Sequence, residues 1–223
     1  MTPRLCAVAA TFIALTASMA AAQSAAVGGV EFAIGPAWIG GATMTSLSVT
    51  ETQASGAPRT VLDLTREMTS AAAFEARVAV RVTAHLDAEA IGSYARPQLS
   101  VTASNDVEGA PATTASEQLQ QFTVGGGASW YLVRRDGTTK TWPFIAASAA
   151  YARQLHQPTT LADSGLLVDA GGGLEQSLVI RSGRLKRLGV RADIRGRVRP
   201  KAWFADGHIH MSPMAVASLF FRF

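Results

Sequence analysis

The sequence predicts an all-β protein, namely an eight-stranded antiparallel up-and-down transmembrane β-barrel whose strands cross a membrane. Three observations carry this prediction. Apolar and polar residues alternate along successive segments, which is the period of a β-strand. The connections between these segments alternate between short and long. The final segment places an apolar residue at every second position up to Phe223.

The alternating segments number eight and cover residues 30–39, 73–84, 88–103, 119–134, 141–154, 166–181, 188–199 and 212–223. In the first, Phe32, Ile34 and Trp38 share one face. In the third, we expect Ile91 and Ala95 to lie on the apolar face.

The segment 188–199 gives the clearest signal. One face holds small and apolar residues such as Val190 and Ile194. The opposite face is charged at every position and consists of Arg191, Asp193, Arg195, Arg197 and Arg199. A surface strand of a soluble sandwich would also turn charges outward, but several other segments show the same alternation. In a membrane barrel the apolar face meets lipid and the polar face lines the lumen.

A charged side chain inside a narrow barrel must be paired or hydrated, because an unpaired buried charge is costly. We therefore expect an interior network of salt bridges and hydrogen bonds. Its predicted members are Glu31, Glu75, Arg77, Arg81, Glu175, Arg191, Asp193, Arg195 and Arg197. Eight strands leave an interior just wide enough for side chains, so a wide pore is not expected.

The connections show the asymmetry of a membrane barrel. Residues 85–87, 136–139 and 182–184 form short turns, whereas residues 40–72, 105–118, 155–165 and 200–211 form long loops. This pattern predicts periplasmic turns, extracellular loops and both mature termini on the periplasmic side. Within the longest loop, residues 58–68 are consistent with either a β-extension above the membrane or a short helix.

The first 22 residues have the composition of a secretory signal peptide. Arg4 precedes an uncharged and mostly apolar stretch, and small residues precede the expected cleavage between Ala22 and Gln23. A retained membrane anchor is the alternative, but no stop-transfer flank follows. Sec-type export would leave residues 23–223 as one barrel domain. The mature domain would contain no cysteine, because Cys6 is the only one in the chain.

Composition and local motifs exclude several other classes. Lys and Arg are not concentrated in one tract, so we expect no nucleic-acid partner despite the net charge of +4. The glycine triplets at 125–127 and 171–173 lack the Lys-Ser/Thr of a phosphate loop and are interpreted as strand glycines. His156, His208 and His210 lie in predicted loops, and we expect no metal, cofactor or catalytic site there.

Together, the signal peptide, the eight segments, the loop asymmetry and the Phe-Arg-Phe ending resemble the small eight-stranded outer-membrane β-barrel family, which includes the OmpA transmembrane domain and single-domain porin-like proteins. The resemblance implies a monomer in the bacterial outer membrane that contacts the lipid bilayer and lipopolysaccharide. It also implies that the barrel-assembly machinery reads a C-terminal signal formed by Leu219, Phe221 and Phe223.

Our leading functional interpretation is a non-enzymatic integral outer-membrane protein with a structural or surface-interaction role. A narrow anion-preferring channel or small-solute transporter past Arg191, Arg195 and Arg197 is the first alternative. A lipid-modifying enzyme is the second, because His210-Met211-Ser212 resembles the His-x-Ser element of lipid A deacylases, in which His210 would be the base and Ser212 the nucleophile. It requires His210 or Ser212 to face the outer leaflet. A soluble lipocalin-like barrel, with apolar residues inside, is the third.

Overall fold

The computed structural model describes residues 29–52, 56, 58–104, 110–135, 139–157, 161–180, 186–199 and 209–223. The predicted signal peptide, its cleavage residues Ala22 and Gln23, and His208 lie outside these ranges. No helix among the described residues is long and apolar enough to cross a membrane. The described residues form the strands β1 (Val30–Ile39), β2 (Ala42–Thr52), β3 (Pro58–Met68), β4 (Ala71–Arg81), β5 (Leu86–Ala95), β6 (Gln98–Ser104), β7 (Thr113–Tyr131), β8 (Thr141–Gln157), β9 (Ala162–Ile180), β10 (Arg187–Arg199) and β11 (His210–Arg222).

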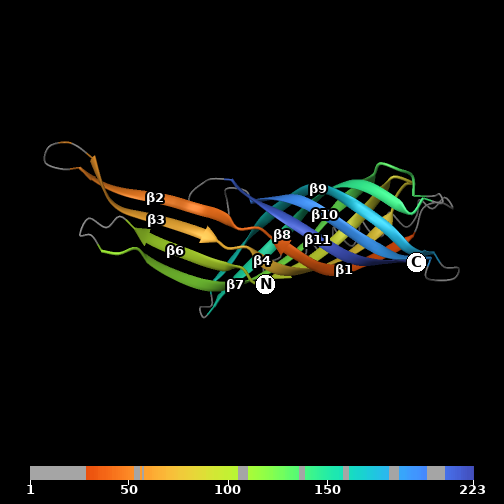
Figure 1. Cartoon of the computed structure of the whole chain (residues 1–223), viewed down its shortest axis with the longest axis horizontal. Helices are drawn as coiled ribbons and strands as arrows, with labels where there is room; N and C mark the ends of the chain where they lie inside the picture. Colours follow the sequence, from red (N-terminus) through yellow and green to blue (C-terminus); the bar gives the residue numbers. More distant parts are fainter. Residues whose placement is uncertain are drawn as a thin grey trace, which may run out of the picture.

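Eight of these strands close into a barrel. Their order around the wall is β1, β4, β5, β7, β8, β9, β10 and β11, and β11 pairs with β1 to complete the ring. Every pairing is antiparallel. This arrangement confirms the predicted all-β fold and the eight-stranded antiparallel barrel, which forms the right-hand part of Figure 1.

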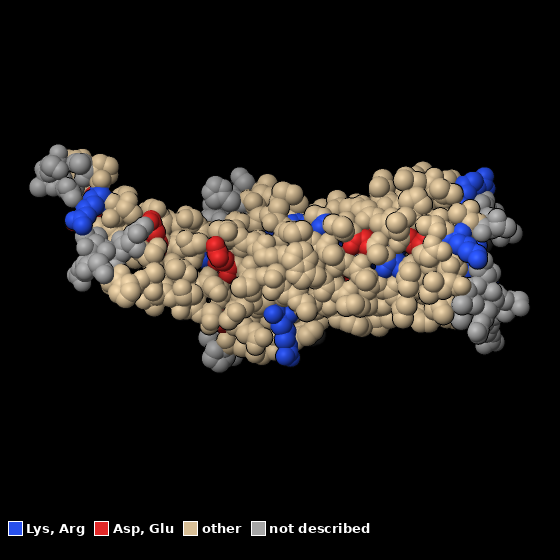
Figure 2. Space-filling view, viewed as in Figure 1, with Lys and Arg blue, Asp and Glu red and all other residues tan. Residues whose placement is uncertain are grey.

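The two faces of the barrel wall have opposite chemistry. Along β10, the side chains of Val190 and Ile194 are exposed, and that of Ile194 is 71% exposed. The alternate side chains of the same strand, Arg191, Asp193 and Arg195, are buried. The same alternation of exposed apolar and buried residues runs along β1, where Phe32 and Ile34 are exposed. Most of the visible barrel surface in Figure 2 is uncharged. The barrel therefore has its charges inside and its apolar side chains outside.

Four strands continue the same sheet beyond the barrel. In this extension β2 pairs with β3, β3 with β6, and β6 with the first part of β7. The second part of β7 belongs to the barrel wall, where it pairs with β5 and β8. Figure 1 shows the extension on the left. We call this side of the barrel the extension end. The side where the strand pairs β4–β5, β7–β8 and β9–β10 connect is the turn end.

The extension changes three sequence predictions. Residues 40–72 were expected to be mainly a loop but contain β2 and β3, so the β-extension alternative for 58–68 is correct and the helix alternative is wrong. The single predicted segment 88–103 is two strands, because it is interrupted at Arg96-Pro97, where proline lacks the N–H that a ladder needs. The segment predicted at 119–134 begins earlier, at Thr113.

The predicted facing of the third segment is also wrong. Asp87, Glu89 and Ala95 are buried and share one phase along β5, and Ile91 has the same phase. Tyr94 is on the outside, where its ring lies 4.9 Å from that of Phe122. The buried carboxylates, not the apolar side chains, determine which face of this strand is turned inward.

Two glycines allow β9 to pass close to β10. Gly171 is opposite Arg195 and Gly173 is opposite Asp193. A Cβ at these two positions would lie 2.0 and 2.1 Å from carbonyl oxygens of β10, which is far inside van der Waals contact. Glycine is required here because the backbones approach closely, in agreement with the interpretation of these residues as strand glycines.

Candidate functional site

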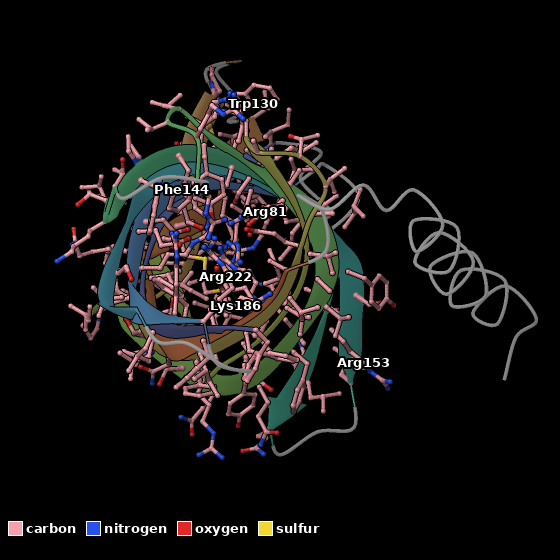
Figure 3. All side chains as sticks on the ribbon, turned by 90° about the vertical axis from the view of Figure 1, so that its right-hand side faces the viewer. Arg81, Trp130, Phe144, Arg153, Lys186 and Arg222 are labelled. Atoms are coloured by element: carbon pink, nitrogen blue, oxygen red, sulfur yellow. The ribbon has the colours of Figure 1, made fainter. Side chains whose placement is uncertain are left out.

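The lumen of the barrel is the candidate site. Among the described residues, seven arginines and seven carboxylates are buried, so their formal charges balance. The arginines are Arg77, Arg135, Arg191, Arg195, Arg197, Arg199 and Arg222, and the carboxylates are Glu31, Glu75, Asp87, Glu89, Asp169, Glu175 and Asp193. Figure 3 looks into the barrel and shows Arg222 and Arg81 toward the lumen, whereas Arg153 lies outside.

At the turn end, two arginines share three carboxylates in a group that we call the basal cluster: Glu31, Asp87, Arg135, Glu175 and Arg222. Arg135 Nη2 donates to Glu175 Oε1 at 2.6 Å and to Glu31 Oε2 at 2.8 Å, and Nη1 donates to Asp87. Arg222 Nη2 also donates to Glu175 Oε1, at 2.8 Å, and to Glu31. These bonds cross-link β1, β5, β9, β11 and the β7–β8 turn.

Aromatic side chains surround the basal cluster. The Arg135 guanidinium carbon lies 3.8 Å from the centroid of the Tyr131 ring, and the Tyr131 hydroxyl donates to Glu175 Oε2 at 2.8 Å. Trp142 is fully buried beside them and contacts Tyr131 and Phe144 in one apolar cluster. The turn end of the lumen is thus filled by side chains that contact one another directly.

The middle of the lumen is organised around Arg191. Its Nη1 donates to Glu89 Oε1 at 2.9 Å and its Nη2 to Ser129 Oγ at 2.9 Å. Ser129 in turn donates to Glu89 at 2.6 Å, and the Phe144 ring centroid lies 3.9 Å from the guanidinium carbon. Arg191 is therefore fixed by a carboxylate, a hydroxyl and an aromatic ring.

A second middle group centres on Glu75. Arg195 forms two bonds to its carboxylate, at 3.1 and 3.0 Å, and Arg77 donates to the same carboxylate at 2.6 Å. Asp193 accepts a bond from Arg195. Further toward the extension end, Arg197 forms two parallel bonds of 2.9 Å to Asp169. Paired bonds of this kind are the strong geometry for an arginine and a carboxylate.

The predicted network residues all lie on the lumen side of the wall, although Arg81 is only partly buried. The pairings differ from those expected, because Arg81, Arg191 and Arg197 lie against three carboxylates outside the predicted set, Asp87, Glu89 and Asp169. Asp169 could have been found from the sequence, because it has the same phase along its strand as Glu175, whereas Asp87 and Glu89 lie on the face that the sequence wrongly assigned to lipid. Arg135 gave no such signal, since it lies in a turn.

His210 and Ser212 do not meet the requirement of the lipid-modifying alternative. Both face the lumen and are buried, and His210 Nδ1 donates to the Thr43 carbonyl at 2.9 Å. Neither side chain faces the outer leaflet. Within the described part of the chain, no group of three histidine, cysteine or carboxylate side chains could hold a metal ion.

A further charged group lies at the extension end, beyond the apolar outer band that includes Tyr151 and Leu166. His156 Nδ1 is 3.0 Å from Glu117 Oε2 and its Nε2 is 3.0 Å from Asp163 Oδ2. Both ring nitrogens can donate only in the protonated ring. Burial alone would lower the pKa of His156, but the two carboxylates outweigh it and raise the pKa above its usual value.

A raised histidine pKa stabilises the fold at low pH, and this contribution is lost as pH rises through the raised value. We expect the wild type to lose stability relative to the variant His156→Gln as pH rises from the ordinary histidine pKa, about 6.5, through the raised pKa of His156. The His156 ring, followed by NMR, should titrate above the usual value, and Glu117→Gln should lower its pKa. An unshifted His156 titration would contradict this prediction.

The distribution of charge decides between a membrane barrel and a soluble one. A lipocalin-like barrel needs an apolar interior, whereas this barrel buries its charges and exposes a band of apolar side chains, which is the pattern of strands that cross a lipid bilayer. The fold is that of a small eight-stranded outer-membrane β-barrel.

The predicted C-terminal signal residues Leu219, Phe221 and Phe223 lie on the outward face of β11 and at its end. The Phe223 ring packs edge-to-face against the Phe32 ring of β1.

Among the comparisons with known proteins, only the comparison with solved structures found matches. No family model and no curated protein matches the sequence. OprG from Pseudomonas aeruginosa matches with a TM-score of 0.48 and 9% identity, over 88% of this chain and 96% of that chain. The N-terminal β-barrel domain of OprF from the same species matches with a TM-score of 0.41 and 12% identity, over 88% and 99%. Ail, the attachment invasion locus protein of Yersinia pestis, matches with a TM-score of 0.38 and 10% identity, over 88% and 99%. These likenesses concern the fold alone.

Proposed function

We propose that this protein is a non-enzymatic integral outer-membrane protein whose barrel anchors the extension sheet and presents it for contacts outside the cell. The observation that carries this proposal is the continuity of β7, which runs for 19 residues from the extension into the barrel wall. In this proposal the chain is a monomer, exported by the Sec route and inserted by the barrel-assembly machinery through Leu219, Phe221 and Phe223. Its barrel contacts the bilayer and lipopolysaccharide.

The surface of the extension supports a role in surface contacts. Leu47 is 54% exposed and Val49 is 41% exposed, and serine and threonine occupy most positions around them in β2. Among the described strands, β2 has only β3 as a partner and so forms an edge of the sheet. Exposed edges and apolar side chains on a firmly attached sheet are features that a partner surface can recognise.

The filled lumen supports an anchor more than a channel. Five strongly bonded side chains of the basal cluster, together with Tyr131 and Trp142, occupy the turn end. We therefore expect purified wild-type protein to show no steady ion conductance in planar bilayers. Steady conductance with anion preference would favour the channel alternative and contradict this part of the proposal.

The anchoring role can be tested by replacing residues 44–66 with a short Asn-Gly turn. We expect the variant to remain in urea-washed outer membranes and to keep the mobility shift between boiled and unboiled samples in SDS, because the barrel strands are unchanged. Intact cells carrying it should lose the surface contacts of the wild type, measured as adhesion or autoaggregation. A variant that keeps full surface binding would contradict the proposal.

A further inference from the structure

Arg199 differs from every other arginine that the structure describes. Its exposure is 0%, and all three of its guanidinium nitrogens are buried with no hydrogen-bond partner among the described residues. The charged side chains that act on it electrostatically are Arg197 and Asp169. Since Asp169 already forms two bonds to Arg197, one carboxylate serves two arginines in this part of the lumen.

Two more unpartnered donors lie on the same patch of the wall. Arg197 Nη1 and Ser212 Oγ are also buried without a partner. Arg197 is directly opposite Ser212, and Arg199 is opposite His210, in the β10–β11 ladder. Directly opposed and diagonal side chains on one face of such a ladder lie within reach of one another. The three donor side chains therefore point into the lumen from adjacent positions.

The unpartnered donors exceed what Asp169 can still accept. A carboxylate accepts about four hydrogen bonds, and Asp169 already accepts two from Arg197. Here, two guanidinium groups and a hydroxyl offer at least three further donors, and the local charge is positive. A buried unpaired cation is costly, and an anion that accepts several bonds at once removes that cost.

We propose that Arg197, Arg199 and Ser212 form a binding site for a tetrahedral oxyanion of the phosphate or sulfate type. The donors face the lumen and not the lipid, so the ligand is a water-soluble anion and not a lipid headgroup. It reaches the site from the extension end, because Arg199 is the last residue of β10 and the basal cluster fills the other end. This site is independent of the surface contacts proposed above.

The proposal can be tested on the full mature chain, purified in detergent micelles in a chloride buffer. Inorganic phosphate is titrated in at constant ionic strength, and binding is measured by calorimetry and by the midpoint of thermal unfolding. We expect saturable binding that raises the midpoint of the wild type. Arg199→Gln should weaken phosphate binding by about tenfold or more, because it removes charge-assisted hydrogen bonds.

Two further variants separate binding from folding. Ser212→Ala should bind phosphate more weakly while keeping every arginine. Arg153→Gln removes an exposed arginine on the outside of the barrel and should bind like the wild type. In phosphate-free buffer Arg199→Gln should be at least as stable as the wild type, and phosphate should remove or reverse that difference. The absence of saturable binding in the wild type, or wild-type affinity in Arg199→Gln, would overturn the proposal.

Discussion

Replacing Arg135 with methionine is expected to lower the free energy of unfolding by about 3–5 kcal/mol, because removing one partner leaves buried charges uncompensated. Arg135 neutralises Glu31, Asp87 and Glu175 at the turn end and makes a hydrogen bond or ion pair to each. After the replacement, Arg222 is the arginine still bonded to Glu31 and Glu175. Among the described residues, Asp87 keeps a long ion pair with Arg81, at 3.8 Å. The loss should appear as a lower urea midpoint of tryptophan fluorescence.

Arg134→Met is the matched control for this prediction. Arg134 is the preceding residue in the same turn, but its side chain is exposed. Its replacement should change the unfolding free energy by less than about 1 kcal/mol. If both variants unfolded at the wild-type urea concentration, the basal cluster would not be a major source of stability.

Replacing Gly171 with alanine is expected to cost more than about 3 kcal/mol, since overpacking of a well-packed site costs about 1–3 kcal/mol and more where the backbone must move. The new Cβ would lie 2.0 Å from the Ile194 carbonyl oxygen and 2.7 Å from the Arg195 Cα. Neither backbone atom can move without breaking the β9–β10 ladder. We expect little heat-modifiable protein in the outer membrane fraction.

Gly196→Ala provides the comparison. Gly196 lies on β10 in the same ladder, opposite Ala170, but the nearest atom to its Cβ position is 3.9 Å away. We expect this variant to assemble normally, with an unfolding free energy within about 1 kcal/mol of the wild type. Equal assembly of the two variants would mean that close strand approach does not limit folding.

The barrel could be predicted from the sequence because lipid and lumen impose opposite polarity on alternate residues. β10 illustrates this best, since Val190 marks the face toward lipid and Arg191 marks the face toward the lumen. The extension could not be predicted with the same clarity, because every residue of β2 beyond Met44 is exposed or half-buried, including Leu47 and Val49. Without a buried face, the alternation that marks a strand is weak.

The interior charges were predictable only in part. Periodicity identified residues such as Glu75 and Arg195, whose strands have a clear phase, and the strand pairing then determined their partners. It missed Arg135, because a turn has no phase, although this residue organises the basal cluster. It also misassigned β5, where Ile91 suggested a lipid-facing side and Glu89 on the same face required the lumen.

The pairing of β1 with β11 has a consequence for the order of assembly. Arg222 and Glu31, which this pairing brings together, are 191 positions apart in the chain, whereas β2 and β3 are neighbours joined by a short connection. Local pairs form faster than distant ones, so we expect the extension to fold before the ring is complete. Until the last strand arrives, Glu31 lacks Arg222. The pairing of β1 with β11 therefore closes the barrel and, in the same step, completes the neutralisation of charge in the basal cluster. This coupling makes barrel closure strongly cooperative.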